Sequence, residues 1–298
     1  MPPDQEHKRV LVAGATGRLG VIVQTLQERG QSVRAMTRDP NSQAAGRLRG
    51  AGVDVIYGDF DDPDSIVRAA AGTDAVFATG TAHKAGPEGE LRHGHNLAGA
   101  VAEAGVPHLV YSSADGAAAD SPVPLFRAKD EVEQHIRSLP IAHTILAPVY
   151  FMENLFNPWN VPALHTGTFP SPIPIDSPLQ QVAIEDLVMV AALAIERPDE
   201  FAGRRITIAS DVVTAEQAAA ELGRLIGREF EPEQIQREQL APGLRALFAW
   251  LEQTGHNADL PTLQHHYPEV HWHSYQTWLH SQWSRLRGLC PREHAGVS

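Results

Sequence analysis

The sequence predicts an α/β fold with a doubly wound parallel sheet, followed by a smaller, mostly helical C-terminal region. Short apolar runs alternate with helix-like stretches through the first half of the chain, which is typical of parallel strand–helix–strand units. A glycine-rich segment, residues 14–20, comes directly after the first apolar run. After Pro148 the alternation stops and prolines become frequent. The chain is therefore expected to change architecture near this point.

Six strands are expected in the first half, and each is a short apolar run. They cover residues 10–13, 32–36, 53–56, 75–78, 108–111 and 143–146. Helices are expected between them at residues 19–27, 44–50, 63–71, 88–104 and 126–137. Asp62, which precedes Pro63, is a candidate N-cap. Right-handed crossovers then place helices on both faces of one parallel sheet.

The second half is expected to begin with a long loop and to continue mostly as helices. Residues 157–178 hold six prolines, which predicts an irregular loop lying over a site. Helices are expected at residues 184–195, 214–226, 240–254 and 274–286, and a strand at 205–209. Thr214 and Gln217 have the spacing of a capping box.

Composition limits the class of protein. The chain has 298 residues, a formal net charge of −12 and one cysteine, Cys290. The deficit of Lys and Arg disfavours direct binding of nucleic acid. The longest apolar stretch, residues 187–195, is far too short to cross a bilayer, and the polar N-terminus does not have the pattern of a signal peptide. A soluble, cytoplasmic protein is expected.

The glycine-rich segment is the first candidate site. Gly14 permits a tight turn out of the strand, Gly17 lets the backbone approach a pyrophosphate, and Gly20 allows close packing of helix on sheet. The following helix start offers free N–H groups to phosphates. This context predicts a Rossmann-type dinucleotide site, with contacts from Gly14, Thr16, Gly17, Arg18, Leu19 and Gly20. The alternative is a tight strand–helix turn that binds nothing.

The end of the second strand selects between the two nicotinamide dinucleotides. An acidic residue there holds a ribose 2′-hydroxyl, whereas arginine favours a 2′-phosphate. Arg38 can grip a phosphate bidentately and Thr37 can donate a hydrogen bond, so NADP(H) is favoured over NAD(H). In one alternative Asp39 turns inward and selects NAD. In another, Arg38 only pairs with Asp39 or Asp61 at the surface.

Further cofactor contacts are expected at the ends of the third and fourth strands. The carboxylate of Asp59 is placed to accept a hydrogen bond from an adenine amino group, and Phe60 to cover the ring. Asp59 would equally serve as a helix cap. Thr79 ends the fourth strand and is expected to contact the cofactor as well.

These motifs together resemble the NmrA-like branch of the atypical short-chain dehydrogenases/reductases. The matching stretches are residues 10–17, 37–40, 58–62, 108–113, 129–133, 148–155, 185–187 and 201–206. The resemblance implies an NAD(P)-binding Rossmann domain over residues 1–155, to which 179–210 contribute, and a C-terminal substrate region over 156–298. That family includes redox-sensing regulators with little turnover as well as quinone, isoflavone and related reductases.

The resemblance also suggests catalytic residues. Typical members use a Tyr four residues before a Lys, with a Ser about a dozen residues before the Tyr; the Lys lowers the pKa of the Tyr and holds the ribose. Lys129 occupies the Lys position, and Ser112 or Ser113 the Ser position. The Tyr position holds Leu125, which cannot donate a proton. A solvated helix lysine is the alternative for Lys129.

Four further residues are candidates for contact with the substrate. Tyr150, at the end of the sixth strand, is placed to reach a substrate carbonyl, although core packing explains it as well. Asn154 is expected in the pocket by resemblance only. His83 and Lys84 follow the fourth strand and either polarise a substrate or are plain loop residues. The late histidines, including His271 and His273, match no metal-binding spacing, so no metal site is expected.

The leading hypothesis is an NADP(H)-dependent oxidoreductase that passes hydride to a small carbonyl or quinone acceptor. A quinone accepts hydride readily and its product takes a proton from water, so the missing Tyr does not exclude this reaction. The rival is a non-catalytic NADP(H) sensor that acts through a partner protein. Lyase, isomerase or epimerase chemistry on the same fold is a third hypothesis. A homodimer is left open.

Overall fold

The computed structural model describes residues 7–289, without the side chains of residues 82–84 and 239. Cys290 and His294 lie outside the described residues. The chain forms two compact units. Unit 1 joins Met1–Pro148 to Leu187–Ile208, and unit 2 joins Val149–Asp186 to Ala209–Ser298. The division expected from the sequence is at residue 155, with 179–210 joining the first part.

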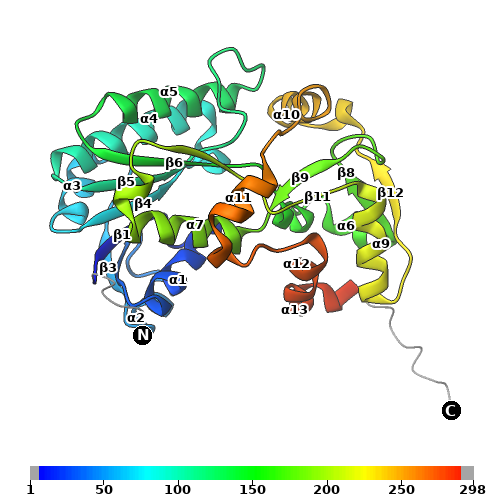
Figure 1. Ribbon diagram of the computed structural model, residues 1–298, viewed down its shortest axis with the longest axis horizontal. Coiled ribbons are helices and arrows are strands. Elements are labelled where there is room, and N and C mark those ends of the chain that lie inside the picture. The colour runs from blue at the N-terminus through cyan, green and yellow to red at the C-terminus, as the bar shows by residue number, and fades with distance from the viewer. Residues whose placement is uncertain (1–6, 290–298) are drawn as a thin grey trace. The chain divides into compact units, whose positions relative to one another are not determined.

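Unit 1 is built on one seven-stranded sheet in which every neighbouring pair is parallel. The strand order is β10-β6-β5-β4-β1-β2-β3, and the order reverses beside β1 (Figure 1). All of the strands predicted for this unit are present. Their bounds are β1 (Arg9–Ala13), β2 (Ser32–Thr37), β3 (Asp54–Tyr57), β4 (Ala75–Thr79), β5 (His108–Ser112), β6 (Ala142–Pro148) and β10 (Arg205–Ile208).

Helices cover both faces of this sheet. They are η1 (Arg18–Val21), α1 (Ile22–Glu28), α2 (Gln43–Gly50), α3 (Pro63–Ala70), α4 (Ala82–Glu103), α5 (Pro124–Ser138), α7 (Ile184–Glu196) and α8 (Pro198–Phe201). The first predicted helix is thus a 3₁₀ turn followed by an α-helix. Helix α4 begins earlier than predicted and kinks at Gly86, whose φ is 67°. Asp62 caps α3 as predicted, because its side chain accepts from the Ser65 N–H.

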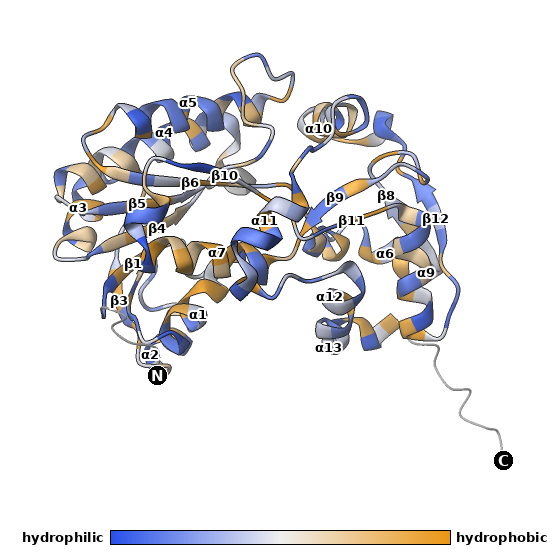
Figure 2. Cartoon of the chain, viewed as in Figure 1, coloured by the Kyte–Doolittle hydropathy of each residue, from blue (hydrophilic) through white to orange (hydrophobic). Residues whose placement is uncertain are grey.

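The core of unit 1 explains why its elements could be predicted. Helices α3, α4 and α5 lie on one face of the sheet (Figure 1). Their apolar side chains form one buried cluster with those of the strands. Helix α7 is apolar almost throughout (Figure 2), and Leu187, Leu193 and Ile195 are fully buried. Strands buried on both faces carry continuous apolar runs, which makes them recognisable in a sequence.

Unit 2 contains two small sheets that were not predicted. The first pairs β7 (Tyr150–Phe151) with β9 (Leu179–Val182) in parallel, and β9 with β11 (Asp211–Val213) in antiparallel. The second pairs β8 (Thr168–Ser171) with β12 (Glu231–Gln234). Helical segments make up most of the rest: η2 (Met152–Phe156), α6 (Val161–Thr166), α9 (Ala215–Ile226), η3 (Arg237–Gln239), α10 (Pro242–Gln253), α11 (Leu260–His266), η4 (Pro268–Val270), α12 (Tyr275–Ser281), α13 (Trp283–Leu286) and η5 (Arg287–Leu289).

The predicted irregular loop over residues 157–178 is wrong, because this segment holds α6 and β8. Pro162 lies in the first turn of α6, where a missing N–H costs nothing. Strand β8 belongs to a two-stranded sheet, so it is an edge strand. Pro170 is tolerated there, because an edge strand does not need every N–H for pairing. The capping box of α9 is confirmed, with Thr214 and Gln217 bonding each other's backbone N–H.

A second apolar core holds unit 2 together. It gathers around the fully buried Trp278, with Tyr275, Leu222 and Met152 nearby. Trp283, in contrast, is 44% exposed. Within residues 7–289, no helix combines the length and the apolar character that crossing a membrane requires.

Candidate functional site

The glycine loop after β1 has a backbone that side chains would obstruct. Gly14 has φ +92°, in the left-handed region that favours glycine. A Cβ atom on Gly17 would lie 3.1 Å from the Gly14 carbonyl oxygen, and one on Gly20 only 2.1 Å from that of Ala15. The N-cap position of η1 is Gly17, so no capping side chain covers the first amides. Two of the loop amides bond within the loop, because the Gly17 N–H donates to the Gly14 carbonyl at 2.9 Å and the Gly20 N–H to that of Gly17 at 3.0 Å. The backbone without side chains leaves room for a phosphate to approach the loop and the start of η1.

The sheet places this loop at its topological switch point. Strand β1 lies between β2 and β4, so the connections after β1 and β4 leave in opposite directions. Thr79, at the end of β4, has its Cγ2 atom 3.4 Å from the position of a Cβ on Gly14. Thr16 and Arg18 are exposed, whereas the Leu19 side chain is buried in the core. A crevice at this edge is where open parallel sheets bind nucleotides.

The end of β2 carries an exposed arginine. Arg38 is exposed and forms no ion pair with any residue in the described part of the chain. Asp39 accepts a hydrogen bond from the Asn41 N–H at 2.9 Å, and Thr37 accepts one from the Asp39 N–H at 3.3 Å. Asp61 pairs instead with Arg92 at 2.8 Å. The surface pairing considered for Arg38 is therefore not found.

The turn after β3 is ordered by its own side chains. Asp59 accepts from the Asp61 N–H at 3.1 Å, and Asp62, not Asp59, caps α3. Phe60 stacks on His93, with ring centroids 5.7 Å apart. The hydrogen bond from Arg92 and the neighbouring His93 lower the pKa of Asp61.

A buried ion pair between α4 and α5 lies beside the ends of β4 and β5, and it was not among the sequence predictions. Lys129 of α5 lies 2.7 Å from Oε1 of Glu90, which comes from α4. The Tyr111 hydroxyl of β5 donates to the same oxygen at 3.2 Å. Burial, followed by the charge of Glu90, raises the pKa of Tyr111. Lys129 is only 8% exposed, so it is not the solvated helix lysine considered as its alternative.

The two serines after β5 have different surroundings. Ser113 donates to Glu133 at 2.5 Å, and Glu133 also binds Arg137 and Arg205 at 2.6 and 2.9 Å. Ser112 is buried, and its side chain has no hydrogen bond within the described chain. Ser113 is thus part of a structural network, and Ser112 is the serine left for a ligand. Leu125 lies in the first turn of α5 and is half-buried.

Two predicted substrate residues, Tyr150 and Asn154, belong to unit 2. Tyr150 lines a small hollow of about 30 Å³, together with Phe169, Gln181 and Tyr275. Asn154 does not line this hollow; its backbone carbonyl accepts from Asn160 Nδ2 at 2.8 Å. The side chains of His83 and Lys84 lie outside the described residues. The structure therefore brings together the loop residues and Thr79, and separately Lys129 and Glu90, within unit 1.

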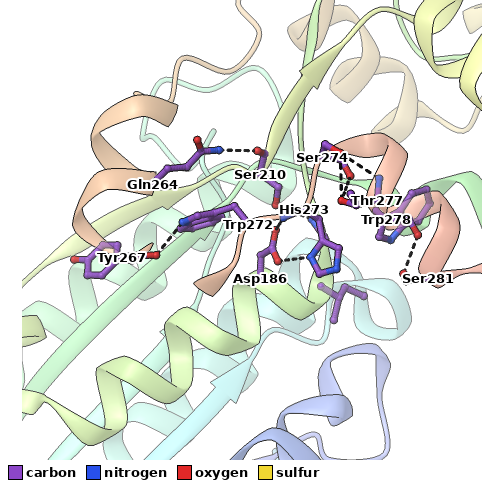
Figure 3. Close-up of polar contacts among 12 residues, drawn as sticks. Asp186, Ser210, Gln264, Tyr267, Trp272, His273, Ser274, Thr277, Trp278 and Ser281 are labelled. Carbon is purple, nitrogen blue, oxygen red and sulfur yellow. Dashed lines mark hydrogen bonds and ion pairs between the residues drawn. The ribbon is translucent and has the colours of Figure 1, made fainter. Parts of the chain in front are cut away.

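The late histidines include one ordered pair, between His273 and Asp186 of unit 2 (Figure 3). Nδ1 of His273 lies 2.6 Å from the Asp186 carboxylate, and this hydrogen bond raises the pKa of His273. His271 has φ 54°, the one positive φ among the described non-glycine residues. Among the side chains that the structure describes, no three from histidine, cysteine, aspartate or glutamate come together as metal ligands.

The strand order and the glycine loop at its switch point define a Rossmann-type α/β fold. The sequence profile of the NmrA-like family matches residues 6–266, so the chain belongs to that family.

Several of the similar proteins are named as reductases. The chain is 30% identical to the (4-alkanoyl-5-oxo-2,5-dihydrofuran-3-yl)methyl phosphate reductase of Streptomyces griseus, over 76% of this chain and 77% of that protein. It is 29% identical to the NAD(P)H azoreductase of Xenophilus azovorans, over 74% of each chain. Among solved structures, the NADPH complex of a quinone oxidoreductase from Escherichia coli superposes with a TM-score of 0.76, at 21% identity, over 92% of this chain and 99% of that chain.

Proposed function

We propose that this protein is an NADP(H)-dependent oxidoreductase that reduces a small carbonyl or quinone acceptor. The observation that carries this proposal is the bare glycine loop at the switch point of a parallel sheet. Pyrophosphate oxygens need closely approaching N–H donors, and a side chain at Gly17 would hinder that approach. A Cβ on Gly20 would displace the loop, because it would lie 2.1 Å from the Ala15 carbonyl oxygen.

The residues expected to hold the cofactor follow from their positions in unit 1. The backbone of residues 14–20 would bind the pyrophosphate, and Thr79 would flank it from β4. Arg38 and Thr37 would bind a ribose 2′-phosphate, since Arg38 is exposed and unpaired in the described structure. Asp59 and Phe60 would border the adenine. Reduced nicotinamide, when bound, supplies the hydride for the acceptor.

The acceptor class is limited by the absence of a tyrosine at position 125. Leu125 cannot supply a proton, and the ammonium of Lys129 is hydrogen-bonded to Glu90. An acceptor whose reduced oxygen takes its proton from water avoids this difficulty, and a quinone is such a compound. The names of the relatives, an azoreductase, a dihydrofuranone phosphate reductase and a quinone oxidoreductase, support an electron-poor conjugated acceptor.

A direct assay tests this proposal. The purified protein is mixed with NADPH and a panel of quinones, azo dyes and aldehydes, and absorbance of the reduced cofactor is followed. We expect consumption above the background rate with at least one quinone or aldehyde, and faster consumption with quinones, because Leu125 cannot supply the proton that an aldehyde needs. Tight NADPH binding without consumption for any acceptor would overturn the reductase and favour a non-catalytic redox sensor.

A further inference from the structure

Glu90 and Lys129 form a buried pair whose net charge is zero. The Glu90 side chain is 0% exposed and that of Lys129 is 10% exposed, with 2.7 Å between Oε1 and Nζ. Such a pair is costly to desolvate and is weak evidence for stability alone. Its presence at a ligand-binding edge therefore suggests a functional role.

The carboxylate of Glu90 is fixed in place by the turn after β4. Its Oε2 atom accepts from the Thr81 N–H at 2.6 Å. A Cβ on Gly80 would lie 1.8 Å from Oε1, so the carboxylate packs directly against the backbone of the turn. Tyr111 adds a third donor from β5. Glu90 therefore cannot swing away, and the position of the Lys129 ammonium is fixed with it.

This pair lies where the second half of a dinucleotide binds. Gly80 and Thr81 directly follow β4, and Tyr111 immediately precedes the last residue of β5. In a doubly wound sheet the two nucleotide halves bind on opposite sides of the switch point. The glycine loop and Arg38 belong to the β1–β2 side, so the β4–β5 side is the nicotinamide side.

Among the side chains that the structure describes, a second buried carboxylate near this point is also charge-paired. Glu133 contributes to the raised pKa of Tyr111, but its carboxylate is bound by Arg137 and Arg205. A substitution of Lys129 or of Glu90 therefore changes the charge of this pair by one unit and leaves the Glu133 group as it is. The oxidised nicotinamide ring carries a positive charge that the reduced ring lacks.

We infer that Glu90 is a positioning residue that sets the preference of the site between oxidised and reduced nicotinamide, by holding and neutralising Lys129. An uncompensated ammonium near the ring would disfavour the oxidised form by Coulomb repulsion. With Glu90 in place, the site binds the oxidised and the reduced form with similar affinity. The oxidised product is then neither repelled by a positive charge nor held by a negative one. This inference rests on the proposed function, because it requires a nicotinamide dinucleotide.

The test measures a ratio of affinities, which a merely structural role would not change. Dissociation constants for NADP⁺ and NADPH are determined by calorimetry for the wild type and for E90Q, K129M and the double variant. We expect the ratio Kd(NADP⁺)/Kd(NADPH) to rise about tenfold in E90Q and to fall about tenfold in K129M. The double variant, which removes both charges, should return to the wild-type ratio.

The matched control is E196Q, in the same unit. Glu196 is a buried carboxylate paired with Arg29 at 2.6 Å, at the edge where Lys8 precedes β1 and donates to Ile195. That is the amino edge of the sheet, away from the glycine loop, so E196Q should leave the ratio unchanged. The inference is overturned if a folded E90Q keeps the wild-type ratio.

A second variant keeps the test decisive if E90Q does not fold. In K129M, Glu90 retains its bonds to Thr81 and Tyr111, and an unchanged ratio in that variant would equally overturn the inference. If the wild type binds neither nucleotide, the proposed function itself is wrong. If the wild type binds both and only the ratios stay constant, the proposed function stands without this inference.

Discussion

The carboxylate of Asp186 holds His273 by two hydrogen bonds. Its Oδ1 lies 2.6 Å from the imidazole Nδ1, and its Oδ2 accepts from the His273 backbone N–H at 2.9 Å. Asp186 is fully buried in the first turn of α7, and His273 comes just before α12 (Figure 3). Unit 2 thus anchors the chain before α12 to a carboxylate that would otherwise be a buried, poorly compensated charge.

The protonated form of His273 should stabilise unit 2. The hydrogen bond to Asp186 raises its pKa, and burial opposes this in part, while the charges of Glu185 and Glu153 also raise it. A raised histidine pKa contributes stability that is fully present below the unfolded value of 6.5 and is lost as pH rises through the folded value. We expect H273Q to lower the melting temperature more at pH 5.5 than at pH 8.5.

The matched control for this histidine is H280Q. His280 is exposed on α12 and therefore close in sequence to His273. Its substitution should change the melting temperature little, and equally at both pH values. A constant difference between H273Q and wild type across this pH range would show that only the neutral hydrogen bond matters.

Glu153 should destabilise unit 2 when it ionises. Its Oε1 accepts from Trp278 Nε1 at 2.8 Å and from the Ile184 N–H at 3.2 Å, and burial raises its pKa to about 7. For an acid with a raised pKa, the native state loses stability as pH rises from the unfolded value of 4.5 to about 7. The full loss is of the order of 3 kcal/mol.

The variant E153Q keeps both hydrogen bonds and removes the charge. We therefore expect E153Q to melt at a higher temperature than wild type at pH 8 and at nearly the same temperature at pH 5. Differential scanning calorimetry at the two pH values makes the comparison. A lower melting temperature for E153Q at pH 8 would mean that the ionised carboxylate is better compensated than its burial indicates.

Substitution of Gly20 should damage the loop selectively. A Cβ at this position would lie 2.1 Å from the Ala15 carbonyl oxygen, whereas one on Gly99 in α4 has no neighbour within 4 Å. G20A should displace the loop and weaken NADPH binding more than about tenfold, since several N–H donors move together. G99A should stabilise the protein by about 0.5–1 kcal/mol, because alanine is the better helix former. Wild-type affinity in G20A would show that the loop does not bind phosphate.

Unit 1 could be predicted because its signals are local. Most of its strands are short apolar runs, such as the fully buried residues 10–13, and the helices between them have boundary signals of their own. Asp62 and Pro63 fix the start of α3 from sequence alone. The start of α4 was missed, because Gly86 and Pro87 interrupt the helical pattern there.

Unit 2 was harder to predict because its strands depend on partners far away in sequence. Strand β7 is two residues long, and Tyr150 pairs with Gln181. Strand β8 contains proline and is ordered by residues 231–234. Elements this short carry no periodicity to detect, and proline content favoured a loop in its place.

Within the site, Lys129 was identified through the family resemblance and Glu90 was missed. A signal for Glu90 was present, since it lies on the same face of α4 as Gly94, Leu97 and Val101, at intervals of four, three and four residues. An acidic residue on an apolar helix face implies a buried partner. That this partner is Lys129 follows only from the packing of α4 against α5.

Arg38 should determine the choice between the two nicotinamide dinucleotides. It is exposed at the end of β2 and has no protein partner in the described structure, so its guanidinium is available to a 2′-phosphate. We expect wild type to bind NADPH more tightly than NADH, and R38A to lose roughly 10–100-fold in NADPH affinity while NADH affinity is unchanged, as fits the loss of a charge-assisted hydrogen bond. The wild-type preference should also weaken as salt is raised, because the arginine is exposed.

R68A is the control, since Arg68 is an exposed arginine of α3 that only approaches Asp62, at 3.8 Å. A preference for NADPH that survives in R38A would assign the 2′-phosphate to another cation, and Arg18 in the glycine loop would be the next to substitute.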